Sequence, residues 1–288
     1  MIRSVAVDVA SAPRRGTRRR SRLRAALTRL WPRARSRRRL LRRFRKAPPA
    51  LKGFVVGLLL VTAAFAVNAI YQVMRKPTEL YFPVSGVLAK APADTWRAYG
   101  PLFRRHSTAV ISPELLAALA QVEGSGDPVA RTYWRWRLTA EPFEMYRPAS
   151  SAVGMYQLTD AAFADARRFC IHDHVVVEDG PWNDWHSCWF NSLYMRVLPG
   201  DAVELTAVLL DRGVSQVLAR QHSANASLQQ KQDLAALIHL CGAGAAEAYA
   251  RRGFRLAAGE RCGDHEAAVY LARVNAAKRD FARRAAND

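Results

Sequence analysis

A single glutamate, Glu123, is the residue of this sequence best placed to do chemistry. It ends the apolar run LLAALAQVE, in which Leu116 and Leu119 recur with it at helical spacing, and a Gly-Ser-Gly turn follows. That spacing places the carboxyl on the apolar face of a helix, close to its C-terminal end. Desolvation and the negative end of the helix dipole both disfavour the ionised carboxylate. We therefore expect an acid able to protonate a leaving group near neutral pH.

A second segment, SAVGMYQLTD at 151–160, supplies the surroundings that such an acid needs. Together with ISPELLAALAQVEGSGDP at 111–128, it resembles the first two motifs of the lytic transglycosylases, the lysozyme-like enzymes that cleave bacterial peptidoglycan. A later segment, HEAAVYLARV, is a looser match to the third motif of that family, and the resemblance spans roughly residues 108–275. It implies that Glu123 is the catalytic residue. The substrate-binding residues that it implies are Ser125, Gly154, Met155, Tyr156, Gln157 and Tyr270.

The sequence departs from the family pattern at two places. Gly124 follows the catalytic position, where the family commonly has Ser, so that Ser125 would have to serve instead. The family's AYNAGPG reads IHLCGAG here, which puts Leu240 where the cleft Asn is expected and His239 beside it. An alternative therefore stays open: a catalytically weak or inactive peptidoglycan-binding or envelope-assembly protein with the same fold.

The resemblance implies cleavage of the MurNAc–GlcNAc bond by one carboxylate. The acid protonates the bridging oxygen and then accepts the proton of the muramic acid C6 hydroxyl, which closes a 1,6-anhydro ring without metal or cofactor. A hydrolase would need a second carboxylate. The candidates for it are Asp127, Glu141, Glu144 and Asp160. Other enzyme classes find no support, because the sequence has no P-loop, GxSxG or HExxH motif.

The elements that must position this chemistry begin with an uncharged run of 22 residues from Gly53 to Met74, GFVVGLLLVTAAFAVNAIYQVM. As a helix it would reach about 33 Å, enough for a hydrocarbon core of about 30 Å. Thr62 and Asn68 are its clearly polar side chains, and Tyr71 lies where an aromatic anchor is expected. A buried core helix or a cleaved signal peptide fits less well, because the run lacks a polar face and the region before it is long.

The net charge of +20 is concentrated before this run. Residues 1–52 hold 19 of the 44 Lys and Arg residues and one acid, which gives +18; the remaining 25 basic and 23 acidic residues give +2. Cationic segments stay inside, so we expect a cytoplasmic arm at 1–52 and a periplasmic location for residues 75–288. The arm is expected to lie along the lipids of the inner membrane, with Leu27, Leu30 and Trp31 in the interface; nucleic-acid binding is the less favoured alternative.

All four cysteines follow the predicted membrane span. They are Cys170, Cys188, Cys241 and Cys262. An even number in an oxidising compartment favours two disulfides, and the pairs 170–188 and 241–262 each close a local loop. A zinc site is the alternative, because three histidines, at positions 172, 174 and 186, lie between the first two cysteines.

Helix signals recur throughout the predicted outer region, so we expect a mostly α, lysozyme-like domain over 94–288, behind a turn-rich tether at 75–93. Expected helices run from about Asp94 to Arg105, Pro113 to Glu123, Asp160 to Cys170, Asn183 to Arg196, 202 to 221, Ser227 to Cys241, up to Arg252, and from Asp264 to Arg284. A short β element is expected near Thr132–Leu138, in an aromatic-rich insertion that either stacks on sugars or packs. The expected partners are glycan strands, with wall growth or a secretion or pilus machine as the setting.

Overall fold

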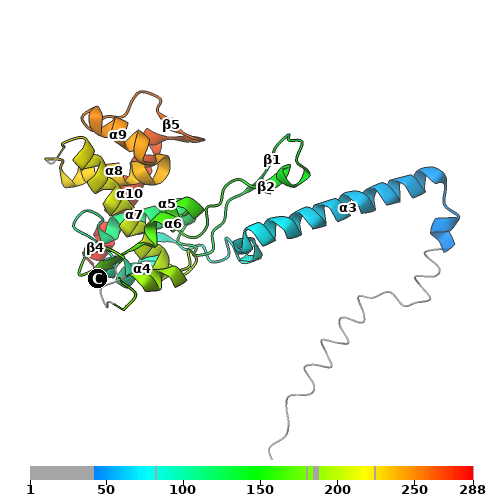
Figure 1. The fold of residues 1–288 in the computed structure, drawn as a ribbon, viewed down its shortest axis with the longest axis horizontal. Helices are drawn as coiled ribbons and strands as arrows, with labels where there is room; N and C mark the ends of the chain where they lie inside the picture. The colour runs from blue at the N-terminus through cyan, green and yellow to red at the C-terminus, as the bar shows by residue number, and fades with distance from the viewer. Residues whose placement is uncertain (1–41, 82, 180, 184–187, 224, 288) are drawn as a thin grey trace, which may run out of the picture. The chain divides into compact units, whose positions relative to one another are not determined.

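The computed structural model describes residues 42–81, 83–179, 181–183, 188–223 and 225–287 (Figure 1). Most of the basic arm, with Leu27, Leu30 and Trp31, lies outside the described residues, as does the zinc candidate His186. The chain divides into two compact units, Met1–Ala66 and Val67–Asp288. The second unit contains all of the predicted site residues.

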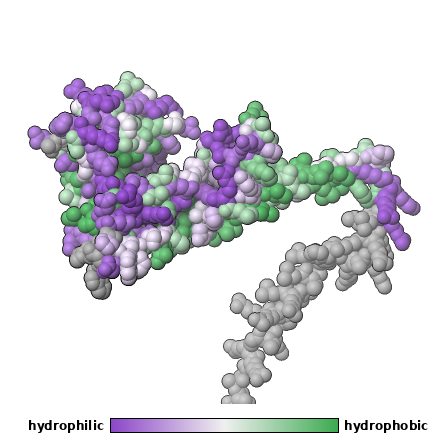
Figure 2. Space-filling model, in the orientation of Figure 1, coloured by the Kyte–Doolittle hydropathy of each residue, from purple (hydrophilic) through white to green (hydrophobic). Residues whose placement is uncertain are grey.

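Helix α3, Pro49–Arg75, contains the predicted apolar run. It is the described helix that is long and apolar enough to cross a membrane, with a mean hydropathy of 2.2 over its most apolar window, of which 6% is buried. Hydrophobic residues cover its visible face in Figure 2. The low burial argues against a core helix of a water-soluble domain, because such a helix buries at least one face.

The second unit is built mainly of helices, which confirms the mostly α prediction: the structure is 59% helix and 9% strand. Its helices are α4 (Pro92–Arg105), α5 (Pro113–Gly124), α6 (Asp160–Ala166), α7 (Pro199–Arg220), α8 (Leu228–Cys241), α9 (Ala243–Arg251) and α10 (Ala267–Ala285). Helix α5 is central: the six residues from Leu115 to Ala120 are all buried, and its largest interfaces are with α10 and α4. An all-round apolar sequence is typical of such a core helix.

Capping residues begin α5, α6 and α8 where the sequence predicts. The Ser112 hydroxyl accepts a hydrogen bond from the Leu115 amide at the start of α5. Thr159 caps α6 in the same way, and Ser227 forms a capping box with Gln230 at the start of α8. At the end of α5, Ser125 adopts a left-handed conformation with φ 51°, which ends the helix directly after Glu123 and Gly124.

The predicted helix from Asp160 to Cys170 is longer than the observed one. Helix α6 ends at Ala166, and Phe169–His172 (β3) pairs in antiparallel register with Val175–Glu178 (β4). Asp173 and His174 form the two-residue turn between them with φ of 48° and 65°. Two consecutive positive φ angles are the geometry of a type I′ hairpin turn, and Val175–Val177 favour strand over helix.

The prediction of a helix over 183–196 is also wrong for the residues of that range that the structure describes. The described residues there form a short 3₁₀ turn, η3 (Trp189–Leu193), while Asp184 lies outside the described residues. Helix α7 begins at Pro199, before the expected start at 202, since proline at the first helical position loses no hydrogen bond. Asp264 does not cap the last helix, because it lies in the turn between β5 (Arg261–Cys262) and β6 (His265–Glu266).

The β element expected near Thr132–Leu138 is present as Trp134–Trp136 (β1), which pairs with Tyr146–Pro148 (β2). A short 3₁₀ turn, η2 (Pro142–Glu144), lies in the connection. We call residues 134–148 the aromatic hairpin; Figure 1 shows it projecting from the helices of the second unit. Its second strand is too short for an alternating pattern to reveal it in the sequence.

The segment expected to be a tether is fixed to the helical unit. It begins with a 3₁₀ turn, η1 (Pro77–Tyr81), in which Glu79 is buried. The Glu79 carboxylate accepts hydrogen bonds from Arg131, at 2.8 Å, and from the Trp134 indole, at 2.9 Å. Further along, the Lys90 amide donates to the carbonyl of Ser125 at 2.8 Å. A buried carboxylate held by a cation and an indole makes this segment part of the folded unit.

Candidate active site

Three helices meet at the Glu123 carboxyl. Glu123 lies in the last turn of α5, and 18% of its side chain is exposed. The Tyr270 hydroxyl of α10 donates a short hydrogen bond to Glu123 Oε1. His239 Nε2, in the last turn of α8, lies 3.7 Å from the same oxygen. The acid therefore lies at the end of an apolar helix, as the sequence predicts, and is mostly shielded from solvent.

Tyr270 is the hydrogen-bond donor of this site. Its side chain is 5% exposed, and the burial together with the negative charge of Glu123 raises the pKa of the phenol well above its usual value of about 10. The phenol therefore stays protonated at any physiological pH and donates to the carboxylate. The sequence prediction of Tyr270 as a site residue places it on the sugar side, whereas the structure places its hydroxyl on Glu123.

His239 is a member of the site that no motif singled out. Its side chain is 6% exposed, and at 3.7 Å its ring is too far from Glu123 for a hydrogen bond but close enough for an electrostatic interaction when it is protonated. The sequence shows His239 only as the neighbour of Leu240. The one signal that could have found it is its position one turn before the Gly242 at the end of α8.

A groove of about 310 Å³ lies between α6, α7 and the junction of α8 with α9, and His239 is one of its lining residues. Its polar lining residues are Gln157, Thr159, Asp165, Arg212, Gln216 and His239. His239 thus contacts both the groove and the Glu123 carboxyl. Of the predicted substrate-binding residues, Gln157 is the one that lines this groove.

The segment Gly154–Gln157 follows a tight turn that fixes which of its side chains reach the groove. Gly154 and Gln157 have φ of 83° and 49°. The side-chain amide of Gln157 donates to the backbone carbonyls of Gly154, at 2.8 Å, and Ala130, at 3.1 Å. Met155 and Tyr156 are buried in the hydrophobic core, at 0% and 1% exposure. The structure therefore corrects the prediction that these two side chains bind substrate.

Gly124 makes the close approach between α5 and this segment. A Cβ atom at Gly124 would lie 2.8 Å from both the Cα and the carbonyl oxygen of Met155. Such a contact is too short for two backbone segments to accommodate without movement. This explains why no serine follows the glutamate directly. Ser125 lies instead at the exposed, left-handed end of the helix, where its carbonyl rather than its hydroxyl is bonded.

The carboxylates considered for a hydrolytic mechanism have other partners or lie in solvent. Asp127 is buried and accepts hydrogen bonds from the amides of Gly86, at 2.6 Å, and Val129, at 2.9 Å. Asp160 pairs with Arg196 at 2.6 Å. Glu144 pairs with Arg75 and Arg147, and Glu141 is exposed in the aromatic hairpin.

Asp165 is a carboxylate of the groove that the sequence prediction missed. It lines the groove 3.5 Å from Arg212, and 54% of its side chain is exposed. Asp165 lies in the middle of the predicted helix that begins at Thr159, and its position relative to the groove depends on how α6 packs on α7. The sequence carries no signal for that packing.

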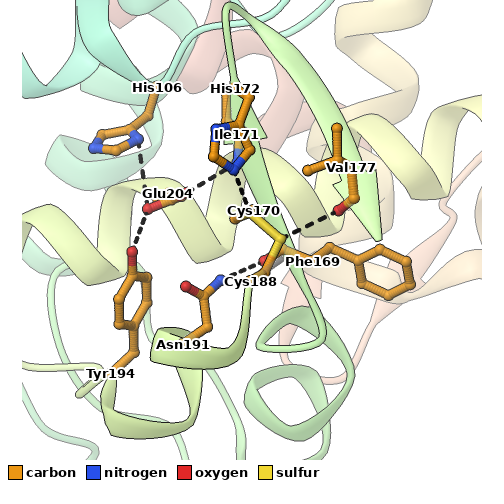
Figure 3. The surroundings of a disulfide bond; sticks show 10 residues. All are labelled: His106, Phe169, Cys170, Ile171, His172, Val177, Cys188, Asn191, Tyr194 and Glu204. Atoms are coloured by element: carbon orange, nitrogen blue, oxygen red, sulfur yellow. Dashed lines mark hydrogen bonds and ion pairs between the residues drawn. A yellow bond between two sulfur atoms is a disulfide. The ribbon is translucent and has the colours of Figure 1, made fainter. Parts of the chain in front are cut away.

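The four cysteines form the two disulfides favoured by the sequence, Cys170–Cys188 and Cys241–Cys262. Figure 3 shows the first of them with His172, whose Nε2 lies 3.1 Å from Cys170 Sγ. These three residues bring a nitrogen and two sulfurs within 4.8 Å of one another. Zinc binds thiolates, however, and both sulfurs here are bonded to each other, so the donor set does not fit the zinc alternative.

A second cavity, of about 460 Å³, lies beside this disulfide and around Glu204 of α7 (Figure 3). Glu204 accepts hydrogen bonds from the Ile171 amide, at 2.9 Å, and from the Tyr194 hydroxyl, at 2.8 Å. His106 Nδ1 lies 3.7 Å from the same carboxylate, and burial lowers the pKa of His106 despite that negative charge. Both oxygens of Glu204 are satisfied within the protein, which is typical of a structural network that holds β3 on α7.

Comparisons with protein-family models, with curated proteins and with solved structures found no match. The Glu123 site and the groove beside it are the features of this chain that bear on its function.

Proposed function

We propose that this protein is a membrane-anchored peptidoglycan lytic transglycosylase with a lysozyme-like domain. One observation carries the proposal: the Glu123 carboxyl lies at the end of a buried helix, held by Tyr270, and is joined through His239 to a groove. Both contacts are made to Oε1, and among the described residues no hydrogen bond to Oε2 is seen. The second oxygen is therefore the one that we propose meets the substrate.

The proposed reaction needs one group that first gives and then takes a proton. Glu123 in its acid form protonates the oxygen between MurNAc and GlcNAc, and the C1–O bond of MurNAc breaks. The resulting carboxylate accepts the proton of the C6 hydroxyl, whose oxygen closes on C1. The products are a free GlcNAc end and a 1,6-anhydro-MurNAc end. The acid form of Glu123 is restored, and no water is consumed.

The proposed location follows from α3 and the disulfides. Helix α3 crosses the inner membrane with the basic arm in the cytoplasm, because cationic segments are retained there. The domain that follows then lies in the periplasm, where disulfides form and persist. The glycan strands of the cell wall are in the same compartment.

The test uses the full chain, purified in detergent and incubated with murein sacculi, with the released fragments identified by mass spectrometry. The wild type should release anhydro-muropeptides, and Glu123→Gln should reduce their rate by at least about 10²-fold. Glu114→Gln, in the first turn of the same helix, is the matched control and should retain the wild-type rate. Anhydro products from Glu123→Gln at the wild-type rate would overturn the proposal.

The same assay separates the two other functions. A hydrolase would release reducing ends in place of anhydro ends, and Asp165 is the carboxylate of the groove that would serve it. We expect Asp165→Asn to keep the anhydro products. Binding of wild-type protein to sacculi without any released fragment would instead indicate a peptidoglycan-binding protein without turnover, as the departures at Gly124 and Leu240 suggest.

A further inference from the structure

The aromatic hairpin carries an exposed apolar surface that the Glu123 site does not use. Its exposed large apolar side chains are Trp136, Leu138, Phe143 and Met145, and the exposed Tyr133 directly precedes it. Trp136 is 62% exposed and Leu138 is fully exposed. Clusters of such residues on one projecting element are rare on water-soluble surfaces and mark a site of interaction.

Contacts of the hairpin with the last two turns of α3 indicate what this surface meets. The side-chain amide of Asn68 donates to the Tyr146 carbonyl at 2.7 Å, and that of Gln72 donates to the Phe143 carbonyl at 2.5 Å. The rings of Tyr71 and Phe143 lie 4.6 Å apart between centroids. Asn68 and Gln72 are buried, at 7% and 4% exposure. The hairpin thus covers the polar amides of an otherwise apolar helix, and uncovered amides are costly in lipid.

The level of these contacts along α3 places the hairpin at the membrane surface. About 20 helical residues cross a hydrocarbon core of about 30 Å, so that a span beginning at Gly53 ends near Gln72. At about 1.5 Å per residue, Asn68 lies about 6 Å inside that end. An element bonded to both residues must reach the interfacial layer, where tryptophan and tyrosine are enriched.

We propose that the aromatic hairpin is a second membrane contact, which inserts its apolar side chains into the outer interfacial layer of the bilayer. The inference depends on the membrane span assigned to α3 under the proposed function. Arg135 and Arg137 are exposed on the same element and would reach the phosphates of anionic phospholipids. The one exposed acid of the hairpin, Glu141, lies in the connection, while Glu144 is neutralised by Arg75 and Arg147.

Lipid fits this surface better than sugar does. Sugars need ring faces with polar partners, whereas the most exposed of the large apolar side chains of the hairpin, Leu138, is aliphatic. One face of Trp136 already stacks on Tyr146, with 4.6 Å between ring centroids. The Phe143 and Tyr146 carbonyls of the hairpin are bonded to α3, and the groove beside Glu123 is lined by other segments.

The test uses the full chain reconstituted in vesicles of phosphatidylcholine and phosphatidylglycerol, with bromine on shallow acyl positions to quench nearby tryptophans. We expect Trp136→Phe to lower the quenched part of the emission, because it removes a tryptophan from the interface. Trp182→Phe is the matched control: that side chain is 79% exposed on another segment, and its removal should leave the quenched part unchanged. Equal quenched emission from wild type and Trp136→Phe would overturn the proposal.

Two further measurements keep the failures apart. If sodium carbonate extracts the protein from the vesicles, the membrane span is wrong and the hairpin proposal falls with it. If the protein resists extraction and Trp136 is not quenched, only the hairpin proposal fails. A change in Trp136 emission on adding chitooligosaccharides in detergent, without quenching by lipid, would overturn it in favour of a glycan contact. The release of anhydro-muropeptides tests the enzyme independently of all three outcomes.

Discussion

Two side chains act on a single oxygen of the Glu123 carboxyl. The Tyr270 hydroxyl fixes the rotation of the carboxyl by donating to Oε1, and His239 lies 3.7 Å from the same atom. The position of the other oxygen is then fixed as well. A carboxyl that is already held in one orientation loses little entropy when it reacts with a bound substrate. Such positioning accounts for a large part of the rate enhancement of enzymes.

Removing the Tyr270 hydroxyl should therefore lower the rate without unfolding the protein. We expect Tyr270→Phe to reduce the rate of anhydro-muropeptide release at saturating substrate by about 10- to 100-fold, because the carboxyl loses its fixed orientation. The matched control is Tyr249→Phe, a buried tyrosine of α9 whose hydroxyl does not contact Glu123. Tyr270→Phe with the full wild-type rate would mean that the hydroxyl has no positioning role.

Burial of His106 should make stability depend on pH. Burial lowers the pKa of His106 below its usual value of about 6.5, with Glu204 and Asp201 opposing this effect and Arg105 adding to it. Between the lowered value and about 6.5 the unfolded chain binds more protons than the folded one, so the free energy of unfolding falls as pH falls through that window. Above the window the stabilisation is fully present.

The measurement is the free energy of unfolding in detergent, followed by circular dichroism from pH 7.5 down to pH 5. The variant His106→Gln should lose part of the decline seen in the wild type, because it has no proton to take up. The exposed His265 gives the control variant His265→Gln, which should decline like the wild type. Equal slopes for all three proteins would show that His106 does not contribute.

At the residue scale the sequence predicts those members of the site that lie in local patterns. Glu123 follows from the spacing of leucines and a helix stop, and Tyr270 from a motif. His239 and Asp165 were missed, because what makes them site residues is the packing of α8 and α6 on α7. The motif predicts that Met155 and Tyr156 bind substrate, because it does not show which side chains of an irregular segment point into the core. Both are core residues.

At the scale of elements, one close approach connects the acid to the groove. The end of α5 lies directly on the backbone of Met155, and Gly124 leaves the space for that contact. Two residues after Met155, Gln157 lines the groove. A side chain at position 124 would push the end of α5 away from Met155, so the glycine keeps the acid close to the segment that lines the groove.

Replacing Gly124 by alanine should separate these two elements. The added Cβ would lie 2.8 Å from the backbone of Met155, and we expect the free energy of unfolding to fall by about 1–3 kcal/mol, as for other overpacked sites. Anhydro-muropeptide release should fall with it. Gly200→Ala is the control, because its nearest neighbour would be Leu102 Cδ2 at 4.0 Å, and it should unfold like the wild type in the same denaturant titration. A fully stable Gly124→Ala would contradict the close approach.

Element boundaries were predicted well where a cap decides them and poorly where a turn does. Ser112, Thr159 and Ser227 all begin helices as expected, because a side-chain cap is a local interaction. The β3–β4 hairpin was missed, since its turn residues, Asp173 and His174, are not glycine and take positive φ angles only in the folded chain. A single proline, at position 199, begins a helix or stops one depending on its neighbours.

At the scale of the whole molecule, all four cysteines follow α3 in the sequence and all are paired in disulfides. This gives a test of topology in intact bacteria that express the full chain. We expect thiol-reactive polyethylene glycol to label none of the four after denaturation without reductant, and all four after reduction. In a strain without its periplasmic disulfide oxidase, labelling should appear without reductant. Four reactive thiols in the normal strain would place the domain in the cytoplasm.

The attachment of the segment after α3 has a consequence for which wall material the proposed enzyme would reach. Glu79 is buried against Arg131 and Trp134, and Lys90 is bonded to the end of α5, so the segment that follows α3 is held to the second unit at both of these residues. A free linker would let the enzyme sample strands over a wide range of heights. If α3 spans the membrane as proposed, this attachment keeps the helical unit close to the end of the span, so we expect the glycan strands within reach to be those near the membrane.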